Sequence, residues 1–417
     1  MKYLIFCFAL IGCCISSSHA QSDTLTISYE QAQEMVVQKN LQIIATQYDI
    51  QIAEAQLKQA RLWRNPLFVW NADMYSVEQN RYMNWNNQRL IQVEQVISIS
   101  GKHRNEVRLA RMNVELSKLS VADAMRSLLY ECAIQYTNLQ TAQAQLSLYA
   151  GSIKQYEEVL KFAETQLAAG NMAGNDVTRL KTELLELRTQ QQTVLSDIET
   201  ASGQLRILLA IPDNVPIKTI PRQRPSVEKL SLETIIAIAK ESRPDYKLRK
   251  QGIAYEEQNL KLQKSLALPD INFGYQPHDK GSNYVRPYSG IVLEFSVPLF
   301  DRNQGGIQEA NARVKQAKAN LNIVDQQISQ EITTSYNQFL IQQQGLDRYN
   351  SALIAELEAF NNSSLESYNK RLITLLEFID QQRIYIQTKS QQLDLFNGYM
   401  QAINDLNFRV GGTVINE

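Results

Sequence analysis

The chain has 417 residues, of which 44% are hydrophobic, and its 42 basic and 43 acidic side chains nearly cancel. A balanced charge lacks the basic surface by which proteins hold nucleic acid, so the sequence predicts no nucleic-acid partner. The length is sufficient for two or three ordinary domains.

The N-terminus has the pattern of an export signal. Lys2 precedes an apolar run from Tyr3 to Ile15, and Ser18-His19-Ala20 supplies small residues before a cleavage point. The run is too short for a membrane-spanning helix, and no later run reaches about 18 apolar residues. We expect a signal peptide at 1–20, cleaved after Ala20. The alternative is the lipobox-like Leu10-Ile11-Gly12-Cys13, which would leave lipid attached to Cys13.

Three of the four cysteines lie in this signal, which leaves Cys132 alone in the mature chain. A single cysteine forms no internal disulfide. Because Cys132 stands in a helical pattern beside Ala133 and Ile134, we interpret it as a small packing residue.

The rest of the chain contains an internal repeat, in which similar sequence recurs about 200 residues later. Residues 93–104 align without a gap on 293–304, and Tyr136 falls on Tyr336 at the same offset. Solenoid repeats have periods of about 20–50 residues, so this pattern indicates one duplicated unit. We expect an internal two-fold repeat, with repeats at 21–211 and 230–417 and a proline-rich linker at 212–229.

Each repeat begins with a shorter helical pattern, at about 28–61 and about 231–266, followed by two strand-like stretches. In the last stretch, Tyr288 to Leu299, the odd positions from 291 onward are all apolar and most even positions are small or polar. Such strands with aromatic residues near their ends are typical of a membrane β-barrel, and the alternative is a soluble hairpin packed on helices. The strands are expected at about 66–75, 88–99, 270–277 and 288–299.

Two long segments, 67–211 and 299–417, contain no proline, so both are free to be helical. Their apolar residues recur at alternating spacings of three and four, a period typical of supercoiled helices. We expect one helix at 102–168, roughly 100 Å long at 1.5 Å per residue, with a glycine-containing turn and a return at 177–209. The second repeat is expected to follow with 302–367, a turn at 368–374, and a return to about 408.

Four strands cannot close a barrel, and open sheet edges are not tolerated in lipid. A dimer would supply eight strands, whose interior is filled by side chains, whereas a trimer supplies twelve and leaves a lumen. The predicted fold is therefore mainly α with a small membrane β portion. Long antiparallel helical hairpins form a trimeric α-barrel, and four strands per chain contribute to a 12-stranded β-barrel.

Local motifs then point to a family. Leu25-Thr26-Ile27-Ser28-Tyr29-Glu30-Gln31-Ala32 and Arg243-Pro244-Asp245-Tyr246 are similar to the openings of the two repeats of the outer membrane efflux protein (TolC) family. Pro298-Leu299-Phe300-Asp301-Arg302-Asn303-Gln304-Gly305, with Ser100-Gly101-Lys102-His103-Arg104, resembles the heavy-metal branch of cobalt–zinc–cadmium and copper–silver types. The resemblance covers essentially the whole mature chain.

The resemblance implies a homotrimeric outer-membrane channel that passively conducts substrates, metal cations or drugs, from periplasm to exterior. It implies docking by a periplasmic adaptor (a membrane fusion protein) and energy from an inner-membrane pump of the RND type, with the helical barrel in the periplasm. The alternatives are a channel for type I protein secretion and a periplasmic coiled-coil scaffold. The sequence does not specify the substrate, which the pump usually selects.

The resemblance also implies a periplasmic gate. Leu375-Leu376-Glu377-Phe378-Ile379-Asp380 matches the acidic motif of the family, which places Glu377 and Asp380 at the entrance. Asp176 matches the counterpart in the first repeat, and Tyr368 matches a tyrosine that helps to hold the entrance closed. The segment Asn369-Lys370-Arg371-Leu372-Ile373 departs from the family, which usually has a glycine there and often a basic residue nearby. Lys370 and Arg371 crowd this turn, which leaves the basic partner of these carboxylates open. The alternative is that Asp176 only caps a helix and that Glu377 and Asp380 are solvated.

The remaining polar candidates are two glutamates and two histidines. Glu94 and Glu294 occupy equivalent strand positions, and we expect both to face the lumen, because a charge at the bilayer midplane costs roughly 2–4 kcal/mol for basic residues and less for acids. His103 and His278 do not have metal-ligand spacing. We find no catalytic or phosphate-binding motif, so the sequence predicts neither an enzyme, nor a metal site, nor a cofactor.

Overall fold

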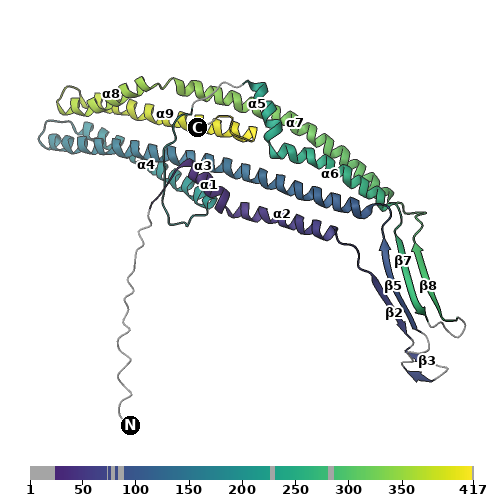
Figure 1. Ribbon diagram of the computed structural model, residues 1–417. Helices are drawn as coiled ribbons and strands as arrows, with labels where there is room; N and C mark the ends of the chain where they lie inside the picture. Colours follow the sequence, from purple (N-terminus) through teal and green to yellow (C-terminus); the bar gives the residue numbers. More distant parts are fainter. Residues whose placement is uncertain are drawn as a thin grey trace, which may run out of the picture.

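A computed structural model describes residues 24–72, 74–76, 80–82, 89–225, 231–279 and 286–415. Long helices run side by side and end in a small sheet (Figure 1). The chain is mainly helical with a small β portion, as predicted. The expected signal peptide and Cys13 lie outside the described residues. In the described ranges, no helix is both long and apolar enough to cross a lipid bilayer.

The helices of the first half begin with α1 (Tyr29–Lys39) and α2 (Leu41–Ala60) and continue with the long pair α3 (Lys102–Ala168) and α4 (Gly174–Leu209). The bounds of α3 are those predicted from the sequence. The second half contains α5 (Leu232–Ser242), α6 (Pro244–Leu266), α7 (Gln304–Asp347), α8 (Ser351–Asn369) and α9 (Leu375–Val410).

Three helices that the sequence predicted as continuous are interrupted, and local chemistry explains each break. Asn40 is extended, and its side chain accepts hydrogen bonds from the amides of residues 42 and 43, which starts α2. Pro244 disfavours a helical conformation at Arg243, which is extended, so α6 starts afresh. The predicted helix 302–367 ends at Asp347, because Asn350 is extended and accepts a hydrogen bond at 2.8 Å from the amide of Leu353.

The four-stranded sheet is antiparallel throughout, in the order β2 (Leu67–Ala72), β5 (Arg89–Ile97), β7 (Ile271–Asp279), β8 (Tyr288–Phe295). The central pair joins the two halves of the chain, because β5 belongs to the first half and β7 to the second. Within the chain, β2 and β8 are the edges of the sheet.

Two short strand pairs were not predicted. β1 (Leu25–Ile27) is parallel to β6 (Ile217–Thr219), and β3 (Tyr75–Ser76) is antiparallel to β4 (Arg81–Tyr82). β6 lies in the segment predicted as a linker. The hydroxyl of Tyr136 lies 3.0 Å from the carbonyl oxygen of Ile27 and 2.8 Å from that of Ile220, so α3 holds this small sheet in place.

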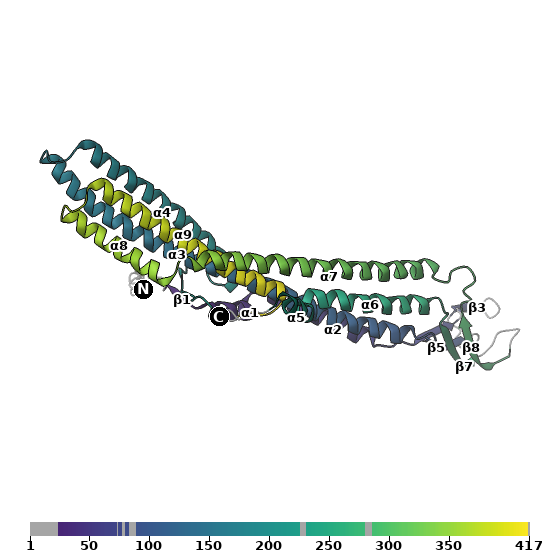
Figure 2. The same ribbon diagram turned by 90° about the horizontal axis from the view of Figure 1, so that it is seen from above.

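Among the residues that the structure describes, three buried clusters hold the helices together. One contains Tyr156, Leu180 and Phe378 near the helical end that lies away from the sheet. A second packs Tyr136 and Leu205 beneath the small parallel sheet. The third belongs to the second half and lies among α5, α7 and α9. Seen from above, α2, α3, α6 and α7 lead to the sheet, while α4, α8 and α9 lie toward the opposite end (Figure 2).

Candidate functional site

The two faces of the four-stranded sheet differ in chemistry. Successive side chains in a strand alternate between faces, and directly paired residues share a face. One face, here called the polar face, carries Gln92, Glu94, Asn272, Gly274, Gln276 and Glu294. The other, here called the apolar face, carries Phe68, Val93, Ile97, Phe273, Tyr275, Ile291, Leu293 and Phe295.

Hydrogen bonds connect the side chains of the polar face across three strands. Asn272 Nδ2 donates to Glu94 Oε2 at 2.7 Å and to Glu294 Oε2 at 3.4 Å. Gln92 donates to the second oxygen of Glu94, and Gln276 donates to Gln92. Gln92 and Gln276 are only 7% and 9% exposed, so the carboxylates are held by packed amides.

Gly274 makes room for this arrangement. A Cβ atom at this position would lie 3.1 Å from Gln92 Nε2 and 3.1 Å from the Cβ of Val292. A larger residue would therefore push the amide of Gln92 away from Glu94. The polar face depends on a glycine at the centre of β7.

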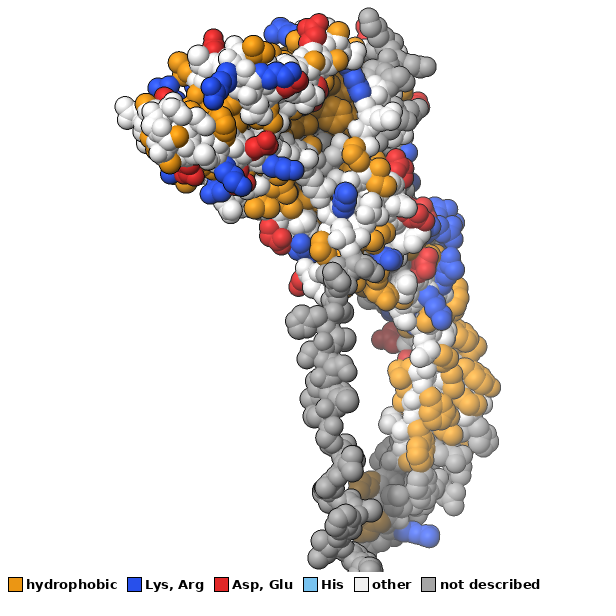
Figure 3. Space-filling model, turned by 90° about the vertical axis from the view of Figure 1, so that its left-hand side faces the viewer, with side chains coloured by type: hydrophobic (Ala, Val, Ile, Leu, Met, Phe, Trp, Pro, Cys, Tyr) orange, Lys and Arg blue, Asp and Glu red, His pale blue; other side chains and the backbone are white. Residues whose placement is uncertain are grey.

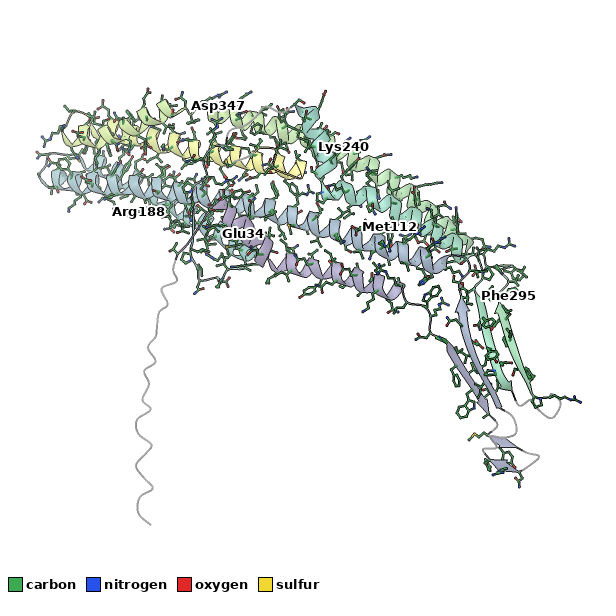
Figure 4. The ribbon with its side chains drawn as sticks, in the orientation of Figure 1. Glu34, Met112, Arg188, Lys240, Phe295 and Asp347 are labelled. Carbon is green, nitrogen blue, oxygen red and sulfur yellow. The ribbon has the colours of Figure 1, made fainter. Side chains whose placement is uncertain are left out.

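The apolar face is exposed in the isolated chain. Ile291, Leu293 and Phe295 are 66%, 62% and 57% exposed. Hydrophobic side chains gather over the strands (Figure 3), and Phe295 lies where β8 meets the helical part (Figure 4). A contiguous apolar surface of this kind marks contact with lipid or with another protein.

At the opposite end of the molecule lie the two helical turns that the sequence assigned to a gate. The turn between α3 and α4 contains Gly170 at φ 74°, and the turn between α8 and α9 contains Arg371 at φ 58°. Both turns close with a hydrogen bond to a carbonyl five residues back, from Asn171 to Gln166 and from Leu372 to Ser367. Arg371 thus adopts the left-handed conformation that suits glycine.

The structure places Asp176 near Tyr368, which lies between these hairpins. Tyr368 is 7% exposed and packs against Phe162 and Phe378, with ring centroids 6.4 Å and 5.3 Å away. Burial raises the pKa of the Tyr368 hydroxyl, and the negative charge of Asp176 raises it further. Tyr368 therefore lies at a packed contact between the first and second halves, with the half-buried Asp176 nearby.

Glu377 and Asp380 have a different environment. Glu377 accepts hydrogen bonds from the Thr374 amide at 2.7 Å and the Thr374 hydroxyl at 2.8 Å, completing a capping box. These backbone and side-chain bonds lower the pKa of Glu377. Asp380 pairs with Arg383 at 2.6 Å. Both carboxylates are exposed, so the predicted gate set divides into a packed pair and an exposed pair.

Arg383 is a basic partner that was not predicted from the sequence, although its spacing of three from Asp380 favours a contact on a helix. Lys370, at the turn itself, pairs instead with Glu366 at 2.5 Å. In the described part of the chain, no group of three or more His, Cys, Asp or Glu residues could hold a metal ion. His103 stacks on Trp63 with centroids 4.5 Å apart, and the side chain of His278 lies outside the described residues.

A network of charges halfway along the helices was also missed. Arg243 contacts Asp245 at 2.6 Å and Glu331 at 3.0 Å, and Arg126 of α3 approaches Asp245 at 3.5 Å. Arg409 of α9 also contacts Glu331, at 3.3 Å. The network links α3 of the first half to three helices of the second.

Comparison with known proteins identifies similar chains. The sequence profile described as "Outer membrane efflux protein" matches residues 32–210 and 235–412. The cobalt-zinc-cadmium resistance protein CzcC of Cupriavidus metallidurans is 19% identical over 412 residues, covering 94% of this chain and 95% of CzcC. The cation efflux system protein CusC of Escherichia coli K12 is 22% identical over 327 residues, covering 73% and 68%. A crystal structure of CusC superposes with a TM-score of 0.71 at 17% identity and 92% coverage of each chain.

Proposed function

This chain belongs to the outer membrane efflux protein family, and we propose that it is the outer-membrane channel of a tripartite efflux system. The family consists of outer-membrane proteins, and the chain is located in the outer membrane. In the proposed assembly three copies form one passive conduit from the periplasm to the exterior. The strands lie in the membrane, and the helices extend into the periplasm.

The observation that carries the proposal is the two-faced sheet with two open edges. Its apolar face suits lipid, and its polar face suits a water-filled lumen. Open edges are not tolerated in lipid, so β2 of one copy is expected to pair with β8 of the next. Such a head-to-tail contact closes into a ring, and three copies give twelve strands with space inside.

The helices supply the second part of the proposal. Each half of the chain contains two helices, two strands of the four-stranded sheet and then a helical hairpin, although the first half adds the short β3 and β4 and the hairpin of the second half is interrupted between α7 and α8. This shared order supports an internal two-fold repeat and an α-barrel continuous with the β-barrel. We place the gate at the hairpin turns, with Asp176, Tyr368, Glu377 and Asp380 as its residues. The partners would be a periplasmic adaptor and an inner-membrane pump of the RND type.

Metal cations are the favoured cargo class. CzcC and CusC are named for cobalt, zinc and cadmium resistance and for cation efflux, and carboxylates on the polar face suit the passage of cations. Drugs and secreted proteins are the competing cargoes. A strain that lacks the chain should accumulate metal cations without losing a secreted protein, and the reverse result would favour type I secretion.

The direct test is fractionation followed by conductance measurement. We expect the mature protein in the outer-membrane fraction, a native mass of three chains, and a cation-preferring conductance after reconstitution into a planar bilayer. Recovery as a soluble periplasmic monomer would overturn the proposal. A trimer that inserts into the bilayer but does not conduct would support the proposed assembly and contradict the proposed role as a conduit.

A further inference from the structure

Positive charge is concentrated where the sheet joins the helices. The four segments that meet there are 58–64, 101–108, 261–270 and 299–306, and they are here called the junction collar. Together they contain nine Lys or Arg residues against three Asp or Glu, whereas the whole chain has a formal net charge of -1. Figure 3 shows basic side chains directly beside the apolar surface of the strands. The collar is therefore a local exception to the balanced charge.

Several of these cations are free to bind an external anion. Arg61, Arg64 and Arg104 are exposed, and none of them forms an ion pair with a residue in the described ranges. In contrast, Lys102 is bound to Asp270 at 3.1 Å. A guanidinium group offers several N–H donors in a plane and recognises phosphate in a bidentate manner.

Large apolar side chains accompany the cations. Leu299 and Phe300 are 63% and 91% exposed, just after the apolar face ends on β8, and Ile99 is 63% exposed just after β5. Trp63 is 67% exposed although its ring stacks on His103, with centroids 4.5 Å apart and planes 25° apart. An aromatic ring fixed next to cations at the edge of an apolar band is typical of the headgroup level of a bilayer.

We propose that the junction collar binds the anionic headgroups of phospholipids in the membrane leaflet that faces the periplasm. The inference rests on the proposed function in one respect, namely that the apolar face lies in the bilayer. Arg61, Arg64 and Arg104 hold the headgroup phosphates. Trp63 and Phe300 enter the boundary between headgroups and acyl chains, and the stack on His103 fixes the orientation of the Trp63 ring.

Two observations and one general effect favour lipid over a soluble anion. The cations lie beside an apolar surface, which an acyl chain needs as a contact and a free phosphate does not. The four segments end or begin helices where these meet the sheet, and Arg61, Arg64 and Arg104 are exposed rather than enclosed in a pocket. Each Lys or Arg next to a membrane strengthens binding to anionic lipid by roughly fivefold.

The test uses the full trimeric protein in detergent with equal amounts of phosphatidylglycerol and phosphatidylcholine of the same acyl chains. Retained lipids are counted by native mass spectrometry. We expect phosphatidylglycerol to be enriched, and the triple variant Arg61→Gln/Arg64→Gln/Arg104→Gln to lose most of that enrichment. The matched control, Lys154→Gln/Lys161→Gln/Arg179→Gln, removes three exposed cations from α3 and α4 far from the sheet and should retain it.

A second measurement does not depend on the arginine variants. In the background Trp70→Phe/Trp85→Phe, Trp63 is the remaining tryptophan, and brominated phosphatidylglycerol in vesicles should quench its fluorescence more than brominated phosphatidylcholine does. An unchanged lipid preference in the triple variant, or equal quenching by both lipids, would overturn the proposal. Displacement of the lipid by excess inorganic phosphate would mean that the arginines bind a free anion, and this result would also overturn the proposal. Failure to enter vesicles would instead reject the proposed function.

Discussion

Glu94 and Glu294, which occupy equivalent positions in the two halves of the chain, accept hydrogen bonds from the same amide nitrogen, Asn272 Nδ2. The sheet order explains this, because β7 lies between β5 and β8 and Asn272 pairs directly with Glu294. Two carboxylates on different strands are therefore held at one level on one face. In a trimer this level would contain six carboxylates.

The shared amide predicts a labelling pattern. Cysteines placed singly at 94 and 294 should react with a water-soluble thiol reagent added to reconstituted channels, because both positions face the proposed lumen. Matched controls at Val93 and Leu293, on the apolar face, should react only with a lipid-soluble reagent. The native Cys132 is 0% exposed and should not contribute. Equal labelling at all four positions would reject the assignment of faces.

A second prediction compares neighbouring positions on β8. Ile291→Arg places a cation on the apolar face and should lower the free energy of unfolding in lipid by about 2–4 kcal/mol, the usual cost near a bilayer midplane. Val292→Arg places the cation on the polar face and should lower the free energy of unfolding clearly less. The measurement is the urea midpoint of folding in vesicles. A larger loss for Val292→Arg would mean that the polar face meets lipid.

The charge network around Arg243 predicts a dependence on pH. Burial alone would raise the pKa of Asp245, but hydrogen bonds and charge from Arg243 hold it below its ordinary value of 3.8. A carboxyl group whose pKa is lowered in the folded state stabilises the fold when the pH is above its ordinary, unfolded-state pKa. That stabilisation is lost as the pH falls through the folded-state pKa. The melting temperature should therefore drop as the pH is lowered from about 5 to about 3.

The same network can be tested by substitution. Arg243→Gln leaves Asp245 and Glu331 without their main partner, and it should cost about 2–3 kcal/mol, less than the loss for a fully buried pair because both carboxylates are partly solvated. The variant should also lose part of the pH dependence. Arg313→Gln, which breaks an exposed pair with Glu309 at 2.7 Å, is the control and should leave the melting temperature unchanged.

The two hairpin turns predict opposite effects of glycine. Arg371 has φ 58°, a conformation that costs a non-glycine residue roughly 1–2 kcal/mol. Arg371→Gly should therefore stabilise the turn between α8 and α9, and Gly170→Ala at φ 74° should destabilise the turn between α3 and α4 by about as much. Hydrogen exchange of the amides in each turn measures both effects, and faster exchange in Arg371→Gly would contradict the argument.

The long helices and main strands could be predicted because their signals are local. A segment without proline, a steady apolar period and a following glycine at residue 170 give α3 its bounds. The breaks at Asn40 and Asn350 were missed, because each depends on one side chain that competes with the helix for backbone amides. β1 and β6 have three residues each, too few for alternation to be recognised.

The candidate sites were only partly predictable for a related reason. The equivalence of Glu94 and Glu294 follows from the repeat, but their shared bond to Asn272 depends on which strands pair and in which register. The capping role of Glu377 could be predicted from the sequence, since Thr374 and Glu377 have the spacing of a capping box. The packing of Tyr368 between two aromatic rings could not be predicted from the sequence, because Phe162 belongs to the other half of the chain.

The proposed gate provides the last prediction, and the structure separates its four residues. Glu377 both carries a charge and caps α9, so Glu377→Ala changes two properties at once. Glu377→Gln removes the charge but keeps an acceptor for the Thr374 amide. If the charge matters, Glu377→Gln with Asp380→Asn should weaken cation selectivity and block by multivalent cations in single-channel recordings, while the hairpin remains intact.

Asp176 and Tyr368 should behave differently, because Tyr368 lies at a packed contact between hairpins and Asp176 lies near its hydroxyl. Tyr368→Ala removes a buried ring beside Phe162 and Phe378, and it should loosen the turns and raise the resting conductance with little change in selectivity. Tyr368→Phe keeps the rings packed and tests the hydroxyl beside Asp176. If all of these variants conduct and select like the wild type, the four residues are ordinary helix surface and the gate lies elsewhere.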